Sequence, residues 1–186
     1  MNNDGNEQGI SGGGAVRVNG GSASIINNTF ACNRSAYVGT GGRGLGGGAI
    51  FSTGQCAITN NVFYDNRANN GWSVYAVVSG SATLSYCDAY NPGQSNTQAN
   101  HYYSPGSVSN MMYSDPLFVD PGHWNDPGTP SDWSDDTWVN GDYHLQSDSP
   151  RIDQGTNTNA PAEDIDGNPR PVNVTCDMGA YEYMGQ

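Results

Sequence analysis

One segment of the chain recurs at a fixed interval, and this recurrence limits the possible folds more than any other feature. Residues 24–34 (SIINNTFACNR) align with residues 57–67 (AITNNVFYDNR) at a constant offset of 33. A weaker third copy over residues 76–91 follows at an offset of about 25. The glycine-rich stretch 38–45 accounts for the longer first interval, as a loop inserted into one unit. Self-similarity of this kind predicts a repeat architecture in which each copy is one structural unit.

The residues within each copy predict short β-strands separated by tight corners. Gly accounts for 26 of the 186 residues, and the copies are rich in turn formers and β-branched residues rather than in strong helix formers. A repeat of roughly 25 residues built in this way predicts a parallel β-solenoid, in which each repeat packs its inward face against its neighbours. Equivalent residues would lie about 4.8 Å apart, so Asn28 is expected to stack on Asn61, and Phe30 on Phe63. The stacked asparagines would form a ladder of hydrogen bonds.

The charge of the chain excludes several classes of partner. Six basic residues, all of them arginines, stand against 18 acidic residues, which gives a net charge of −12. Without a cationic stripe, the chain is expected to bind neither nucleic acid nor an anionic membrane surface. No stretch approaches the roughly 20 apolar residues that span a bilayer, so no membrane insertion is expected. The four cysteines are spaced too irregularly for a zinc site, and they are either buried thiols or one or two disulfides.

Two sets of motifs resemble those of a known group of proteins. A Gly-Gly-Gly-Ala motif followed by Phe-x-x-Asn occurs twice, within residues 12–33 and 46–66. These repeats resemble those of right-handed parallel β-helix proteins, which include pectate-lyase-like enzymes and polymorphic outer-membrane proteins. The C-terminal third is similar to the closing segment of bacterial extracellular members of this group. The motifs are SDPLFVDP at 114–121, GDYHL at 141–145, SPRIDQG at 149–155, DIDGNPRP at 164–171 and DMGAYEY at 177–183.

The resemblance implies an all-β fold, a single-stranded right-handed parallel β-helix of about five to seven coils with an irregular C-terminal tail. Residues 1–121 are expected to form the coils, residues 122–140 a Trp-rich insertion loop, and residues 141–186 the closing segment of the same domain. The resemblance also implies a secreted or cell-surface protein, whose signal would lie upstream because the first residues show no signal pattern. Because a repeat begins almost at once, we infer a fragment or a minimal version of something longer. An uncapped first coil could then pair with a second molecule as a homo-oligomer.

Carboxylates at matched corners of stacked coils could hydrolyse a glycosidic bond. An inverting hydrolase needs an acid and a base roughly 6.5–9.5 Å apart, and a retaining one about 5–5.5 Å apart. Residues one and two coils apart would lie about 4.8 and 9.6 Å apart. Asp65 and Asp88 are the acids near matched positions of successive repeats, and Asp115 could follow on the next coil. These three are the catalytic candidates, and a solvated turn acid is the alternative for each.

Aromatic residues provide the candidates for sugar binding. Trp124, Trp133 and Trp138 lie in the insertion, and Trp72 with Tyr90 forms a second, weaker group. Exposed flat rings stack on the C–H faces of sugar rings, which makes these five residues substrate-binding candidates. Alternatively, the rings pack the insertion onto the solenoid, because a loop of about twenty residues needs a small core of its own.

The pattern Asp164-x-Asp166-x-Asn168 resembles half of an EF-hand loop and could hold calcium through oxygen ligands. It lacks the distal glutamate, and the following Pro169-Arg170-Pro171 breaks any helix. The alternative is a tight turn in which Asp164 or Asp166 pairs with Arg170. Calcium is the only cofactor that the sequence suggests, and none is expected to be required. The sequence has no phosphate-binding or dinucleotide-binding motif that would indicate a nucleotide cofactor.

Together these features predict an extracellular β-helix that engages polysaccharide. A neutral glycan is favoured as the partner, because a chain with a charge of −12 repels uronates. The leading prediction is engagement of such a glycan; if the chain is an enzyme, hydrolysis by paired carboxylates is favoured, and a calcium-dependent polysaccharide lyase is less favoured. The alternatives are a non-catalytic carbohydrate-binding or adhesion module, and a structural surface stalk that has no ligand.

Overall fold

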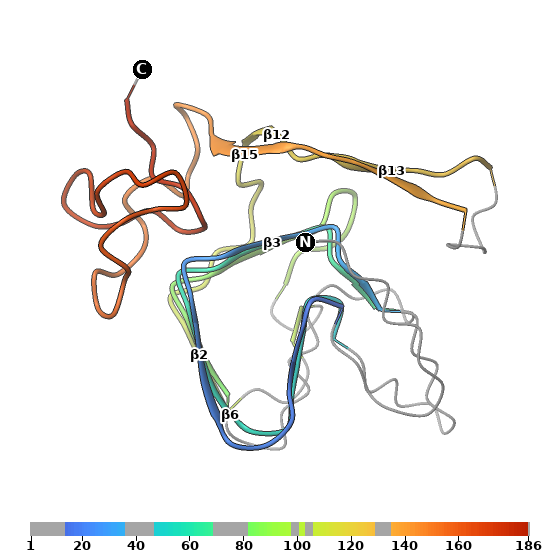
Figure 1. Ribbon diagram of the computed structural model, residues 1–186, viewed down its shortest axis with the longest axis horizontal. Coiled ribbons are helices and arrows are strands. Elements are labelled where there is room, and N and C mark those ends of the chain that lie inside the picture. Colours follow the sequence, from blue (N-terminus) through green and yellow to red (C-terminus); the bar gives the residue numbers. More distant parts are fainter. Residues whose placement is uncertain are drawn as a thin grey trace.

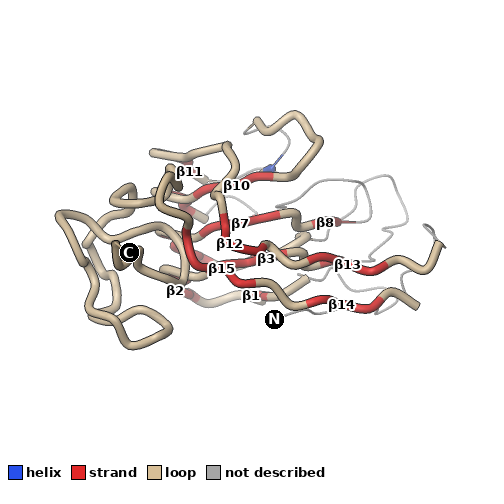
Figure 2. Tube along the Cα trace, turned by 90° about the horizontal axis from the view of Figure 1, so that it is seen from above, coloured by secondary structure: helices blue, strands red, loops and turns tan. Residues whose placement is uncertain are grey.

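A computed structural model describes residues 14–35, 47–68, 82–97, 101–102, 106–128 and 135–185 of the chain (Figure 1). The fold is all-β, as predicted, and its strands are short and gathered in several small sheets (Figure 2). In the ranges described, no helix is long and apolar enough to cross a membrane.

The repeats seen in the sequence lie on top of one another as parallel strands. Figure 1 looks down this stack, so that β2 and β6, or β3 and its partners, nearly overlap. The first repeat contains β1 (Val16–Val18), β2 (Ser22–Ile26), β3 (Thr29–Ala31) and β4 (Arg34–Ser35). The second contains β5 (Ile50–Ser52), β6 (Gln55–Thr59), β7 (Val62–Tyr64) and β8 (Arg67–Ala68), and the next strands are β9 (Thr83–Ser85), β10 (Asp88–Tyr90) and β11 (Ser107–Ser109). The parallel sheets have the orders β11-β9-β6-β2, β10-β7-β3, β1-β5 and β4-β8.

The register agrees with the offset of 33 in three of these sheets. Phe30 pairs with Phe63, and the two rings stack with centroids 5.1 Å apart and planes 8° from parallel. The predicted asparagine stack also forms, because the Asn28 backbone N–H donates to Oδ1 of Asn61 at 2.9 Å. The third repeat pairs at an offset of 26, so Tyr90 lies beside Tyr64. Stacking of Phe30 on Phe63 and of Asn28 on Asn61 is therefore confirmed.

Left-handed backbone conformations form the corners between strands. Asn27 (φ 53°) and Asn60 (φ 56°) occupy equivalent corners, where β2 and β6 give way to β3 and β7. Asn tolerates this conformation better than most residues, because its short side chain can bond locally. Cys32 (φ 54°) and Asp65 (φ 46°) occupy the next pair of equivalent corners. The corner positions of the repeat are thus conformationally equivalent even where the residue type differs.

Two apolar clusters hold the molecule together. The first lies inside the repeats and includes Ile50, Ile58, Phe63 and Leu84, all at most 1% exposed. The second lies between the β3-β7-β10 sheet and the C-terminal segment, and consists of Val62, Phe118, Leu145 and Met178. The sheet is therefore covered on both faces, as is usual for parallel strands.

The C-terminal part begins with an antiparallel ribbon and continues without strands. The ribbon contains β12 (Phe118–Asp120), β13 (His123–Asn125), β14 (Thr137–Val139) and β15 (Asp142–Leu145), with β12 paired to β15 and β13 paired to β14. The segment 122–140 was expected to be a loop, but its described ends form the β13-β14 ladder, in which Trp124 faces Trp138. Residues 146–185 consist of turns and irregular backbone, as predicted for the tail, and lie to one side of the repeats (Figure 1).

All four cysteines are buried and unpaired. Of the two possibilities left open by the sequence, the structure thus has buried thiols.

Candidate functional site

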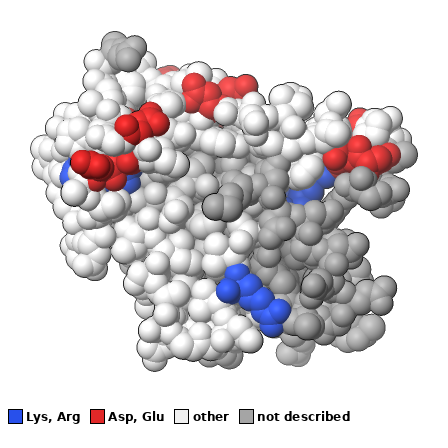
Figure 3. Space-filling model, in the orientation of Figure 1, with Lys and Arg blue, Asp and Glu red and all other residues white. Residues whose placement is uncertain are grey.

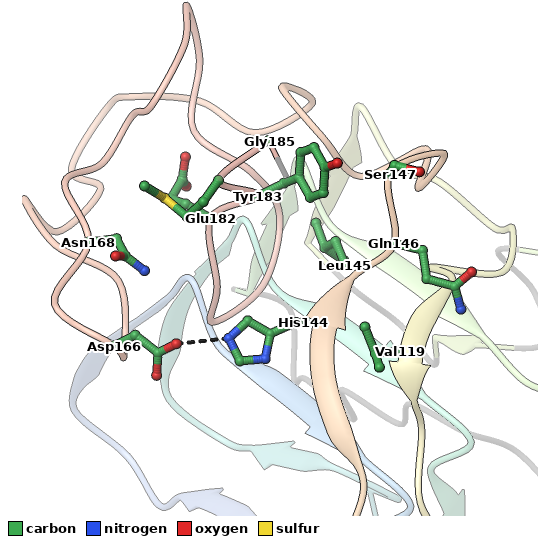
Figure 4. A pocket seen from close by; sticks show the side chains of 11 residues that line it. Val119, His144, Leu145, Gln146, Ser147, Asp166, Asn168, Glu182, Tyr183 and Gly185 are labelled. Atoms are coloured by element: carbon green, nitrogen blue, oxygen red, sulfur yellow. Dashed lines mark hydrogen bonds and ion pairs between the residues drawn. The ribbon is translucent and has the colours of Figure 1, made fainter.

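An open groove lies between the end of the antiparallel ribbon and the irregular tail. It has a volume of about 750 Å³. Figure 4 shows that His144 forms its floor, that Asp166 and Asn168 approach from the tail loop, and that Tyr183 lies on the opposite wall. We call this cavity the C-terminal groove. Its lining is Val119, His144, Leu145, Gln146, Ser147, Asp166, Asn168, Glu182, Tyr183, Met184 and Gly185.

His144 is held between two carboxylates at the floor of the C-terminal groove. Its Nδ1 lies 2.5 Å from Oδ1 of Asp142, and its Nε2 lies 2.8 Å from Oδ2 of Asp166. Asp142 and His144 are two residues apart on β15, so their side chains are on the same face of the strand. The Tyr181 ring packs on the imidazole, with centroids 4.1 Å apart. Partial burial opposes a charge on His144, but the hydrogen bonds to Asp142 and Asp166 outweigh it and raise its pKa above the ordinary value.

The loop that carries Asp166 is organised by the neighbouring Asp164. Oδ1 of Asp164 accepts the backbone N–H groups of Asp166 at 2.9 Å and Asn168 at 2.8 Å. Its Oδ2 accepts the backbone N–H of Glu182 at 3.0 Å and the Asn168 amide at 3.1 Å. Burial alone would raise the pKa of Asp164, but these donors lower it overall. The segment therefore forms a tight turn, which was the alternative interpretation of the predicted calcium loop.

The structure brings two of the three predicted calcium ligands together, because the Asn168 amide donates to Oδ2 of Asp164 at 3.1 Å within this turn. Asp164 is saturated with N–H donors, and Asp166 binds His144. Arg170, which was expected to pair with Asp164 or Asp166, instead lies 2.9 Å from Glu182. Across the described ranges, no group of three or more His, Cys, Asp or Glu side chains is arranged to hold a metal ion.

The structure does not bring the predicted catalytic pair together. Asp88 pairs in register with Val62, whereas Asp65 lies three residues further along, at the corner whose backbone N–H donates to Tyr90. The expectation that Asp65 and Asp88 occupy matched positions is therefore wrong. At the offset of 26, Asp88 lies at the start of its strand, beside the start of β7, whereas Asp65 lies at the corner that follows β7.

Asp88 is also inaccessible to a substrate. Its side chain is fully buried, and its Oδ2 lies 3.5 Å from Nε of Arg151, which is equally buried. Burial raises the pKa of Asp88 to about 7, although Arg151 works in the opposite direction. Asp115 belongs to the same electrostatic group, since it raises the pKa of Asp88 further, but its Oδ1 accepts the backbone N–H of Leu117 in a turn. These contacts join the C-terminal segment to the repeats.

Asp65 is bound to a neighbour on the surface. Its carboxylate accepts two hydrogen bonds from Arg67, at 3.0 and 3.1 Å. Asp65 is thus a paired corner residue, close to the solvated turn acid that was its alternative interpretation.

Two of the predicted sugar-binding tryptophans pack the ribbon onto the first repeat. Trp124 and Trp138 contact edge to face with centroids 5.4 Å apart, and Nε1 of Trp124 donates to the Cys32 carbonyl at 2.8 Å. The Arg34 guanidinium lies 4.3 Å from the centre of the Trp124 ring and forms an ion pair with Asp136. Both rings are half-buried and already in contact with other groups. This agrees with the alternative interpretation, in which the rings pack the insertion onto the repeats.

Tyr90, the remaining aromatic candidate that the structure describes, offers no exposed platform. Tyr90 is half-buried, 6.1 Å from Tyr64 in a tilted arrangement. Trp72 and Trp133 lie outside the described residues.

The C-terminal groove was missed because its key residues are far apart in the sequence. His144 was not among the predicted site residues, and Asp166 was predicted as a calcium ligand. The alternation Asp142-x-His144 was the only available signal, since it places an acid and an imidazole on one face of a strand. Comparison with family models, with curated proteins and with solved structures found no match. The site is therefore interpreted from its own geometry.

Proposed function

We propose that this chain is part of a right-handed parallel β-helix, secreted or displayed at the cell surface, that binds a neutral polysaccharide in the C-terminal groove without cleaving it. The stacked parallel strands and their left-handed corners support the β-helix. The observation that carries the binding proposal is the groove itself. It is open, and it combines hydrogen-bonding side chains with two ring systems, His144 and Tyr183.

The chemistry of the groove matches an uncharged, hydroxyl-rich ligand. Asn168 and Ser147 can each donate or accept a hydrogen bond, and the exposed Asp166 can accept one from a sugar hydroxyl. Flat rings beside such groups suit the C–H faces of pyranose sugars. No Arg or Lys is among the lining residues, whereas two carboxylates are. The groove is therefore better suited to a neutral glycan than to a uronate polymer.

Binding is favoured over hydrolysis because the described carboxylates that line the groove are already bound, Asp166 to His144 and the buried Glu182 to Arg170. Hydrolysis requires two carboxyl groups about 5–9.5 Å apart with room for the scissile bond between them. In the groove, His144 occupies the space between Asp142 and Asp166 and hydrogen-bonds to both. Asp88, a predicted catalytic residue, is fully buried beside Arg151.

The test is to measure retardation of the protein in gels that contain neutral glycans or uronate polymers, together with an assay for new reducing ends. We expect retardation by at least one neutral glycan, none by uronates, and no new reducing ends. The variant His144→Ala should weaken binding about tenfold, because it removes one direct contact and releases Asp166. The control Thr83→Ala changes an exposed residue on another sheet and should bind normally.

Two outcomes would contradict the proposal. If the wild type releases new reducing ends from a glycan, the protein is a hydrolase. Unchanged mobility with every glycan, in a protein that is folded by circular dichroism, would favour the structural stalk.

A further inference from the structure

The strands of the first repeat are all at the edges of their sheets. Among the described strands, β1, β2, β3 and β4 each pair on one side only, with a strand of the second repeat, and each stands last in its sheet. A free strand edge exposes backbone N–H and C=O groups that can pair with another chain. One end of the stack therefore offers four such edges side by side.

A cavity opens at this same end. It has a volume of about 470 Å³, and its floor is formed by side chains of the first repeat such as Val16, Ile25 and Phe30. In the second repeat the equivalent positions Ile50, Ile58 and Phe63 are fully buried, whereas Val16 and Ile25 remain half-exposed. The apolar interior of the stack is thus open here. We call this surface the open end.

A buried, unpaired polar atom points to what covers the open end. Asn66 of the second repeat uses its Oδ1 to accept the backbone N–H of Asn33 at 3.1 Å and the Asn33 amide at 2.8 Å. Its Nδ2 donates to the Phe30 carbonyl at 2.8 Å. Asn66 therefore binds the strand one layer before it.

Asn33 has the same position in the first repeat, but no layer precedes it among the described residues. It is 1% exposed, it lines the cavity, and its buried Oδ1 has no hydrogen-bond partner. Leaving a buried acceptor unpaired costs about 1–3 kcal/mol. The ladder thus lacks an N–H donor at a defined place, which a further strand edge would supply.

We propose that a second copy of this chain covers the open end, edge against edge, as an isologous dimer. A two-fold arrangement brings identical free edges, cavities and Asn33 acceptors together, so each copy can supply what the other lacks. Among the described residues, those that line the cavity carry no charge: they are Ala15, Val16, Ser24, Ile25, Asn28, Thr29, Phe30, Asn33, Ile165 and Ala180. Two chains of charge −12 can approach at such a face with the least repulsion.

Figure 3 looks onto this end of the molecule. The acidic side chains of the described residues lie toward the upper rim and the sides, and the part of this face that described residues form is otherwise mostly uncharged. One arginine patch interrupts it below. This distribution is the one expected of a face that meets a copy of itself. The proposal does not depend on glycan binding.

The experiment is sedimentation equilibrium of the full chain over a wide concentration range, with variants that place a charge at or away from the open end. A monomer has a mass of 19.6 kDa, and we expect the wild type to approach twice this mass as its concentration rises. Ser24→Arg adds an exposed like charge to each copy at the cavity rim and should weaken dimerisation at least about tenfold. Thr83→Arg is the matched control, because Ser24, Ala57 and Thr83 form one column across the sheet. It should dimerise like the wild type.

Amide exchange provides a second measurement that does not depend on the variants. Amides of β2 and β3 should exchange more slowly as the concentration rises, while those of β9 should not change. A wild type that is monomeric at all concentrations overturns the proposal. So does a dimer that Ser24→Arg leaves intact, since its interface then lies elsewhere. If removal of residues 1–13 converts a monomer into a dimer, the chain's own first residues cover the open end, and the proposal is again wrong.

Discussion

Replacement of Asn66 by alanine should destabilise the protein far more than the same replacement of Asn33, although both residues are asparagines buried in one column. Asn33 and Asn66 are both at most 1% exposed. Asn66→Ala removes three hydrogen bonds to the first repeat, two at its Oδ1 and one at its Nδ2. Asn33→Ala removes only the bond that its own amide donates to Asn66.

The magnitude follows from the groups left without a partner. Asn66→Ala leaves the backbone N–H and the side-chain amide of Asn33 without an acceptor in the interior, and it removes one bond to the Phe30 carbonyl, which also belongs to the β3-β7 ladder. At about 1–3 kcal/mol for each unpaired group and about 1 kcal/mol for the lost bond, the loss is about 3 kcal/mol or more. After Asn33→Ala, Oδ1 of Asn66 still accepts the backbone N–H of residue 33, so the loss should be about 1 kcal/mol. The difference between the two variants should therefore be about 2 kcal/mol or more.

Urea denaturation followed by far-ultraviolet circular dichroism measures both free energies of unfolding. Comparison of the variants is sound if the dependence on urea is the same in both, because the surface exposed on unfolding is then unchanged. Equal losses for Asn33→Ala and Asn66→Ala would refute the reasoning. They would mean that the asparagine column does not bind each repeat to the one before it.

Three further predictions concern the contacts between the repeats and the rest of the chain. The pKa of Asp88 is raised from 3.8 to about 7 by burial, so its contribution to stability is fully present below its unfolded pKa and is lost as the pH rises through about 7. Urea titrations at pH 4 to 8 should therefore show wild-type stability falling relative to Asp88→Asn, and parallel curves would contradict this. Trp124→Ala removes the hydrogen bond to the Cys32 carbonyl and the contact with Arg34. It should lower the free energy of unfolding by about 1–3 kcal/mol and change the near-ultraviolet circular dichroism. An unchanged spectrum would show that other contacts hold the ribbon on the first repeat. Asp65→Asn weakens only a surface pair, so stability should change by less than about 1 kcal/mol and glycan retardation should not change at all.

The repeat architecture could be predicted because a stack of strands turns sequence period into spatial proximity. Residues 33 apart become neighbours, so Phe30 on Phe63 follows directly from the alignment. The same logic failed for Asp88, since the third repeat is a weak copy and carries an acid three residues before the position of Asp65. Three residues separate the first position of the strand, where Asp88 lies, from the corner where Asp65 lies. An error of three residues in the alignment of a repeat therefore hardly alters the predicted fold, but it changes which residues are predicted to form a site.

The C-terminal groove had no such periodic signal. His144 and Asp166 are 22 residues apart, and the chain between them follows no regular element. Their distance depends on the turn that Asp164 organises and on the buried pair between Arg170 and Glu182. Contacts of this kind depend on individual side chains, so neither composition nor hydrophobic pattern could locate them.

The irregular tail is nevertheless positioned by the repeats, and the connection runs through the corner asparagines. Nδ2 of Asn27 donates to the Asp177 carbonyl at 3.0 Å. Asn60, one repeat later, donates to the Thr156 carbonyl at 2.8 Å and accepts the Thr156 backbone N–H at 2.9 Å. Residues interpreted from the sequence as turn formers thus also anchor the segment that carries Asp166. Because the C-terminal groove lies between this anchored tail and the ribbon, its shape depends on the register of the repeats.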